Sequence, residues 1–153
     1  MKGILKAMND KYIVYFISKT KKKMQKFIEA KLKENQIDDL VPSYGNIFTA
    51  LYEHGGRLKM SEISHLVNKD KSTVTVLVNR LIERKYIQKQ FSKEDRRVVY
   101  IVLTDKGHAF EPVYKEISAE INAVAFEGFE DTEKEIFLKL LKKMNNNFGR
   151  YTE

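Results

Sequence analysis

The sequence predicts a mainly α-helical chain of the α+β class, in which two short strands form one small β-hairpin. Two observations in the central part of the chain predict this fold class. Residues 60–84 have the pattern of two helices joined by a short turn, and two stretches of β-branched and aromatic residues follow directly after them in the sequence. A third is that long amphipathic helical patterns flank this centre on both sides. With 153 residues, 42% of them hydrophobic, the chain is large enough for one domain with a real core.

Positive charge is concentrated in two parts of the chain. The net charge is +7 and the pI is about 9.4, which favours a polyanionic partner. Residues 57–107 hold 12 Lys and Arg against 6 Asp and Glu, a net charge of +6. Residues 1–40 hold 10 against 5, a net of +5, whereas residues 108–153 hold 6 against 9, a net of −3. A generic surface would not need this asymmetry.

The composition excludes several kinds of chemistry. The absence of cysteine rules out disulfides, thiolate catalysis, cysteine metal sites and cysteine-based redox sensing. No apolar run approaches the roughly 20 residues of a membrane span. The N-terminus lacks the apolar core of a signal peptide, so we expect a cytoplasmic protein with no membrane contact.

The N-terminal part predicts two helices. A long basic amphipathic helix is expected over residues 10–35, and its lysines are interpreted as a solvated face, with a phosphate contact or a partner helix as alternatives. A second helix is expected to open at Pro42 and run to about Tyr52, where paired glycines at 55 and 56 end it. Residues 57–59 are long enough for one short strand.

Residues 60–84 predict a helix-turn-helix. The first helix covers residues 60–68, and the second starts near Asp70, whose carboxylate can accept a hydrogen bond from a free backbone N–H. Apolar residues recur at three- and four-residue steps along one side of the second helix: Val74, Leu77, Val78 and Leu81. The other side carries short hydroxyl and amide groups, one methyl-bearing contact and no carboxylate, as a helix that reads base edges in the major groove requires: Lys71, Ser72, Thr73, Thr75, Val76, Asn79 and Arg80.

The next segment predicts a hairpin with a basic tip. Strands are expected over residues 87–91 and 98–103, joined by the loop 92–95. Alone, such a hairpin is most simply a solvated surface feature. Directly behind a helix-turn-helix it is interpreted as a wing, whose Arg96 and Arg97 can reach the negative potential of a minor groove. Asp95 is expected to hold Arg97 in an extended pose by a bidentate bond.

Two further helices complete the chain. Thr104 is expected to cap a helix running to about Phe126, and Thr132 to open a last helix in a capping box with Glu135. The apolar faces of these helices and of the first one exceed what the small winged core can cover. They therefore predict a two-fold homodimer, with two recognition helices in successive major grooves about 34 Å apart.

The order of elements resembles the MarR family of bacterial winged helix-turn-helix regulators from the first helix to the last. The stretch D-R-R-V-V-Y-I-V-L-T-D-K-G, residues 95–107, resembles the family's wing followed by Leu-Thr-x-x-Gly, and residues 70–81 resemble its recognition helix. The resemblance implies a single chain over 1–153 with a DNA-binding lobe at 44–107. Residues 10–35 and 108–150 would then be dimerisation helices.

The resemblance also implies how the chain would work. Ser72, Thr73 and Thr75 would contact DNA in the major groove, and Arg97, steadied by Asp95, would enter the minor groove. The protein would be a dimeric repressor on a pseudo-palindromic operator of double-stranded DNA. Family members often bind small phenolic or lipophilic compounds between the dimer helices and the DNA-binding lobe.

The sequence departs from the family pattern at two positions. Val76 stands where many members carry arginine or another polar residue, so a thymine methyl contact is expected there instead. Gln90 stands where arginine is common at the base of the wing, which lowers the expected phosphate affinity. Both departures leave the operator sequence open.

Aromatic residues of the first two helices are the candidates for an effector pocket. Together they are the candidates to line a cleft, whereas for any single one a structural role in the hydrophobic core is the preferred interpretation: Tyr12, Phe16, Tyr44, Phe48 and Tyr52. No two of the three histidines stand three or four residues apart, so no helical pair is placed to chelate zinc. There is no Gly-rich phosphate loop or nucleophile elbow, and neither a cofactor nor an enzymatic activity is expected.

A second function is also compatible with these patterns. Some winged domains bind proteins instead of DNA, and the aromatic strip from Phe126 to Phe148 in the acidic C-terminal third would be the surface for it. Binding of the protein to its own upstream DNA separates the two hypotheses.

Overall fold

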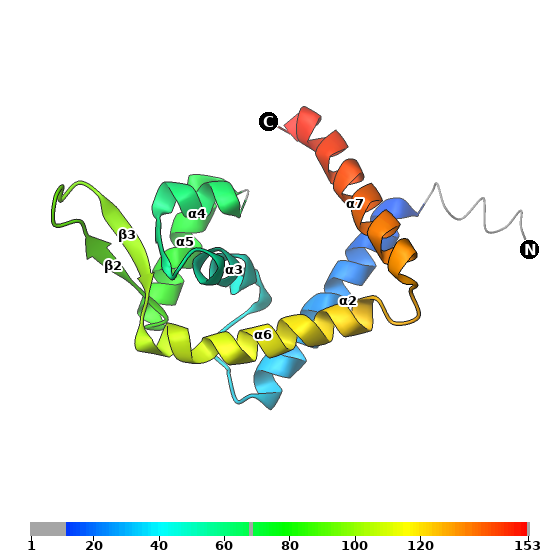
Figure 1. Ribbon diagram of the computed structural model, residues 1–153, viewed down its shortest axis with the longest axis horizontal. Coiled ribbons are helices and arrows are strands. Elements are labelled where there is room, and N and C mark those ends of the chain that lie inside the picture. The colour runs from blue at the N-terminus through cyan, green and yellow to red at the C-terminus, as the bar shows by residue number, and fades with distance from the viewer. Residues whose placement is uncertain (1–11, 68, 153) are drawn as a thin grey trace, which may run out of the picture. The chain divides into compact units, whose positions relative to one another are not determined.

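The computed structural model describes residues 12–67 and 69–152, which form two compact units (Figure 1). The first unit ends at Ile117 and the second begins at Ser118. The start of the first predicted helix, at residue 10, lies outside the described residues. The elements are α2 (Ile13–Glu34), η1 (Pro42–Tyr44), α3 (Gly45–Glu53), β1 (Arg57–Lys59), α4 (Met60–Leu66), α5 (Lys71–Glu83), β2 (Ile87–Phe91), β3 (Val99–Leu103), α6 (Asp105–Ala125) and α7 (Asp131–Thr152). The predicted α+β class with one small sheet is confirmed.

The predicted helix at Pro42 differs from the observed one in its first turn. Residues 42–44 form a 3₁₀ turn, and the α-helix begins only at Gly45. Proline lacks a backbone N–H and fixes φ, which suits a short opening turn. The helix ends where predicted, because Gly55 and Gly56 adopt positive φ values of 72° and 76° and the Gly56 N–H donates to the Leu51 carbonyl at 2.7 Å.

The three strands form one antiparallel sheet in the order β1-β3-β2. β3 begins at Val99, one residue later than predicted. The backbone of Val98 closes the hairpin instead, donating to the Asp95 carbonyl and accepting from the Ser92 N–H, both at 2.9 Å. The hairpin of β2 and β3 extends beyond the helices that cover its base (Figure 1).

The core of the first unit lies between the helix-turn-helix, α3 and the inner face of the sheet. Phe48 is at its centre and stacks on Tyr52, with ring centroids 5.7 Å apart, and meets Phe110 edge-on at 5.0 Å. The largest fully buried side chains are Phe48, Ile47, Leu51, Ile63, Leu81, Ile87, Ile101, Val74 and Val78. Packing of these residues holds α5 against α4 and the sheet.

The start of α6 is bonded to the chain that leaves α5. The Thr104 hydroxyl donates to the Lys85 carbonyl at 2.6 Å and accepts from the Gly107 N–H at 3.1 Å, which confirms Thr104 as a helix cap. The Lys106 ammonium donates to Asp39 at 2.7 Å and to the Arg84 carbonyl at 2.9 Å. The Leu-Thr-x-x-Gly pattern therefore has a structural explanation at this joint.

In the second unit, the predicted capping box at Thr132 and Glu135 is wrong. The helix begins one residue earlier, at Asp131, because the Glu130 carbonyl already accepts from the Lys134 N–H at 3.0 Å. Glu133 then stands three residues after the cap position and accepts from the Glu130 N–H at 3.0 Å. Among the described residues, no helix combines the length and hydrophobicity that crossing a membrane requires.

Candidate nucleic-acid interface

Helix α5 begins at the cap that the sequence predicts. The Asp70 carboxylate accepts from the Thr73 backbone N–H at 2.8 Å. Hydrogen bonds from the Ser72 hydroxyl, then from the hydroxyl and backbone of Thr73, lower the pKa of Asp70 well below its usual range. The carboxylate is therefore ionised and fixes the conformation of the first turn.

The two sides of α5 also agree with the prediction. Val74, Leu77, Val78 and Leu81 are buried against the core. Val76 is 50% exposed on the opposite side. The other candidates are exposed, except for the half-buried Thr75: Lys71, Ser72, Thr73, Asn79 and Arg80. The structure thus brings the seven predicted residues onto one accessible helical face.

The hydroxyl protons on this face are already engaged. Ser72 and Thr73 donate their hydroxyl protons to the Asp70 carboxylate, Thr73 at 2.6 Å. The Thr75 hydroxyl donates to the Lys71 carbonyl at 2.7 Å. Because each hydroxyl has only one proton, these side chains present acceptor lone pairs to an approaching ligand. In the major groove, acceptors pair with the amino groups of adenine and cytosine.

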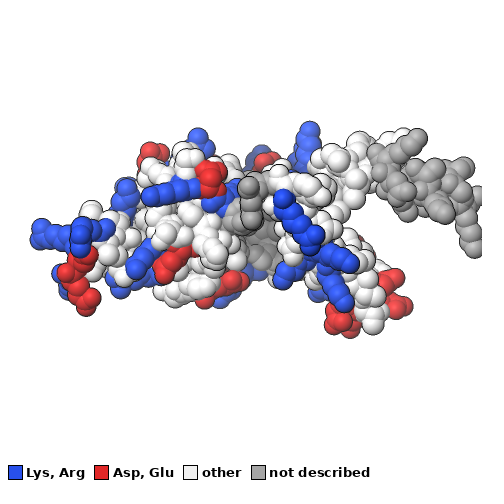
Figure 2. Space-filling model, turned by 90° about the horizontal axis from the view of Figure 1, so that it is seen from above, with Lys and Arg blue, Asp and Glu red and all other residues white. Residues whose placement is uncertain are grey.

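The wing carries the predicted ion pair. Arg97 donates to Asp95 through Nε at 3.1 Å and Nη2 at 3.2 Å, and its backbone N–H donates to the same carboxylate at 3.0 Å. The Arg97 side chain is nevertheless 91% exposed. Its hydrogen bonds hold the pKa of Asp95 below the usual range. Figure 2 shows Lys and Arg side chains gathered at this end of the molecule, over the tip of the hairpin.

The sequence interpretation missed two features of the sheet. The Arg57 guanidinium lies over the Tyr100 ring, 3.8 Å from its centroid. Phe91, at the end of β2, is 61% exposed beside the arginine tip. The alternation of side chains along β2 places Phe91 on the same face as the buried Ile87, so the sequence pattern gave no signal for the exposure of Phe91.

The predicted effector-pocket residues lie in different environments. Tyr44 and Phe48 are buried in the core, and the Tyr52 hydroxyl donates to the Gly107 carbonyl at 2.8 Å. Burial raises the pKa of Tyr52, so it stays protonated. Tyr12 and Phe16 are exposed, and each makes an edge-on ring contact with Tyr15. A cleft shared by both groups stays a prediction.

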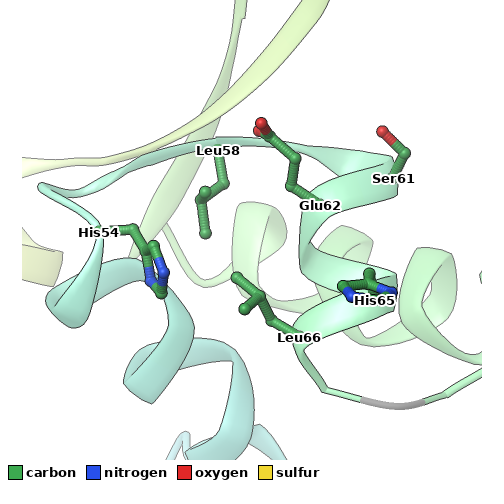
Figure 3. Close-up of a pocket in the computed structure, with 6 residues that line it drawn as sticks. All are labelled: His54, Leu58, Ser61, Glu62, His65 and Leu66. Carbon is green, nitrogen blue, oxygen red and sulfur yellow. The ribbon is translucent and has the colours of Figure 1, made fainter.

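A separate shallow pocket lies at the first helix of the helix-turn-helix (Figure 3). His54 Nδ1 lies 2.9 Å from the Ala50 carbonyl oxygen, and Glu62 accepts from the Lys59 N–H at 2.6 Å. The described part of the chain holds no group of three His, Asp or Glu side chains suited to a metal ion. The pocket is lined by His54, Leu58, Ser61, Glu62, His65 and Leu66.

A helix-turn-helix followed by a β-hairpin with a basic tip defines the winged helix-turn-helix class. The MarR family model matches residues 39–98, which contain the helix-turn-helix, β2 and the loop of the wing, and end directly before β3. The HTH-type transcriptional regulator SarZ of Staphylococcus haemolyticus is 30% identical over 102 residues, which are 65% of this chain and 67% of the relative. The chain belongs to the MarR family.

Solved structures show the same fold along most of the chain. The Staphylococcus aureus MepR–DNA complex matches with a TM-score of 0.77 and 22% identity, over 88% of this chain and 97% of that one. Bordetella bronchiseptica BpsR, whose DNA binding is regulated by 6-hydroxynicotinic acid, matches with a TM-score of 0.72 and 20% identity, over 88% and 99%. The similarity therefore extends well beyond the segment that the family model covers.

Proposed function

We propose that the chain is a sequence-specific DNA-binding transcriptional regulator that represses its target genes as a homodimer. The observation that carries the proposal is the exposed face of residues 71–80 of α5, a stretch without a carboxylate, in the same compact unit as the arginine-tipped wing. A helix of this kind fits a major groove, and exposed guanidinium groups fit the minor groove beside it. SarZ is named a transcriptional regulator, and MepR has been solved on DNA, which supports the same partner here.

We assign the roles of the side chains by their chemistry. Arg96 and Arg97 would neutralise phosphates and enter the minor groove, with Asp95 orienting Arg97. Val76 would meet a thymine methyl group. The remaining residues of the interface would contact bases and phosphates in the major groove: Lys71, Ser72, Thr73, Thr75, Asn79 and Arg80.

The proposed dimer rests on apolar side chains that the single chain leaves exposed. On α2 these include Val14, which is 75% exposed, and on α7 Ile136, which is 57% exposed. Such surfaces on a monomer mark association sites. We therefore assign residues 10–35, of which the structure describes those from 12 on, and residues 108–150 to dimerisation. Residues 44–107 are assigned to the DNA-binding lobe, and the operator would be pseudo-palindromic.

We further infer release from DNA by a small phenolic or lipophilic compound. BpsR supports this class of effector, because a hydroxylated aromatic acid regulates its DNA binding. The aromatic residues at positions 12, 16, 44, 48 and 52 remain the proposed pocket. A regulator of chromosomal DNA works in the cytoplasm, and we propose no enzymatic activity or cofactor.

The test is binding of purified protein to duplexes from its own upstream region, measured by fluorescence anisotropy. Specific binding should weaken steeply with salt, since each neutralised phosphate releases counterions. Arg97→Ala should weaken binding to all sequences, whereas Ser72→Ala should change the preference among them. If no upstream duplex binds at any salt concentration, the protein-interaction function would replace this proposal.

A further inference from the structure

Phe91 is the most exposed large hydrophobic side chain among the described residues of the lobe 44–107. It is 61% exposed, against 50% for Val76 and 44% for Leu66. An exposed phenyl ring loses the free energy that burial would give it. Its position on a projecting hairpin therefore indicates a contact with another molecule.

The register of the sheet fixes the direction of this side chain. Phe91 pairs with Val99, and Ile87, four residues earlier on the same strand, pairs with Leu103. Side chains two and four residues apart share one face of a strand. Ile87 and Ile101 are buried against the helices on that face. Phe91 thus lies on the side of the wing turned towards α5, beyond the end of the core.

We propose that Phe91 is an apolar DNA contact of the wing, packing its ring against the deoxyribose groups that wall the minor groove next to Arg97. This inference rests on the proposed function. A duplex held by α5 on one side and the hairpin tip on the other would cover this face of the wing. Apolar side chains of minor-groove proteins pack in this way beside basic ones.

The surrounding charge favours DNA over a second copy of the chain as the occupant. Lys89, Lys93, Arg96 and Arg97 lie within six residues of Phe91 in the sequence of the hairpin, and the acidic residues of that segment are Glu94 and Asp95. Two identical wings would repel each other through this net positive charge, whereas a phosphodiester backbone neutralises it. The ring would then be covered by the sugars between the phosphates.

The test separates apolar from ionic contributions by their salt dependence. Phe91→Ala should lower the affinity for an upstream duplex about tenfold, the effect of losing much of a buried aromatic contact, with the slope of log K against log salt unchanged. Arg97→Ala should reduce that slope by about 1. Phe91→Leu should keep most of the affinity, because it keeps an apolar side chain of similar reach.

Tyr151→Ala is the matched control, since Tyr151 is an aromatic residue of the second unit that is 88% exposed. It should bind DNA like the wild type. Thermal unfolding checks that Phe91→Ala folds, and a Phe91→Ser variant supplies a second removal of the ring. If the wild type, Phe91→Ala and Phe91→Ser bound the duplex equally, the contact by Phe91 would be overturned while the proposed function would stand.

Two other outcomes would also overturn it. A change in sedimentation of Phe91→Ala without DNA would show that a second copy covers the ring. Failure of the wild type to bind any duplex would overturn the proposed function and this contact together.

Discussion

Gly107 lies directly against the main chain at Tyr86: a Cβ built on residue 107 would be 2.2 Å from the Tyr86 carbonyl oxygen. No side chain fits there without moving backbone, because real Cβ atoms do not approach an oxygen so closely. The same carbonyl accepts from the Thr104 N–H at 3.1 Å. Glycine is therefore required at position 107 by the close approach of the Tyr86 backbone, and not by an unusual φ.

Gly107→Ala should destabilise the protein by about 2 kcal/mol, the usual cost of inserting a methyl group into a packed site. Gly45→Ala is the control, since Gly45 also opens the first turn of a helix but has nothing within 4 Å of a Cβ. That variant should be neutral or more stable by up to about 1 kcal/mol. Urea unfolding measures both, and equal stabilities would contradict the packing described here.

Asp39 should contribute to acid sensitivity. Burial raises its pKa, but hydrogen bonds from Lys106 and Tyr86 outweigh this effect and hold the pKa below the ordinary 3.8. The folded state therefore favours the ionised form, and the stabilisation is present at neutral pH and lost as the pH falls below about 3.8. Asp39→Asn should be less stable at pH 7 and show a shallower loss of stability in acid.

The comparison is made by urea unfolding between pH 7 and pH 3. Because Lys106 is 46% exposed and Asp39 33% exposed, solvent screening keeps the pair's contribution at neutral pH to about 1 kcal/mol or less. Parallel acid curves for the two proteins would show that Asp39 titrates alike in the folded and unfolded states.

Asp70 should stabilise α5 through its cap. Asp70→Ala removes the acceptor of the Thr73 N–H and should lower the stability of the protein, whereas Asp70→Asn, which keeps an acceptor, should lower it less; urea unfolding measures both. The same substitution to alanine releases the Ser72 and Thr73 hydroxyl protons. The Asp70→Ala variant should then prefer duplexes whose bases present acceptors in the major groove over duplexes whose bases present amino groups. A panel of single-base operator variants measures this shift in preference.

Asp95 should favour specific DNA binding even though its charge repels phosphates. Asp95→Asn weakens the hydrogen bonds that orient Arg97, so the affinity for the specific duplex should fall. Affinity for a scrambled duplex should rise, because a negative charge is removed. Anisotropy titrations with both duplexes test this, and a rise for both would show that Asp95 does not orient Arg97.

Local patterns predicted much of the geometry of the candidate interface. The stripe from Val74 to Leu81, the cap at Asp70 and the pairing of Asp95 with Arg97 each depend on residues a few positions apart, so spacing alone was sufficient. The predicted cap of α7 was wrong because the residue that opens the helix, Glu130, is not of a type that marks a helix cap in a sequence. Its backbone N–H is instead satisfied by Glu133.

Tertiary packing decided what the patterns left open. Phe48 and Tyr44 have the same aromatic character as Tyr12, yet the first two are buried and the third is exposed. Helical periodicity does not distinguish these environments, because it does not show which elements cover a face. For the same reason, the exposure of Phe91 could not be predicted from the sequence, because it depends on how far the hairpin extends beyond the helices that cover its base.

Thr104 and Lys106 join the start of α6 directly to the end of α5 by hydrogen bonds. The Thr104 hydroxyl donates to the Lys85 carbonyl, and the Lys106 ammonium donates to the neighbouring Arg84 carbonyl. The absence of a side chain at Gly107 lets the helix lie directly against Tyr86. A rotation of this end of α6 would therefore be transmitted directly to the end of α5, the helix proposed to read DNA bases, because hydrogen bonds join the two.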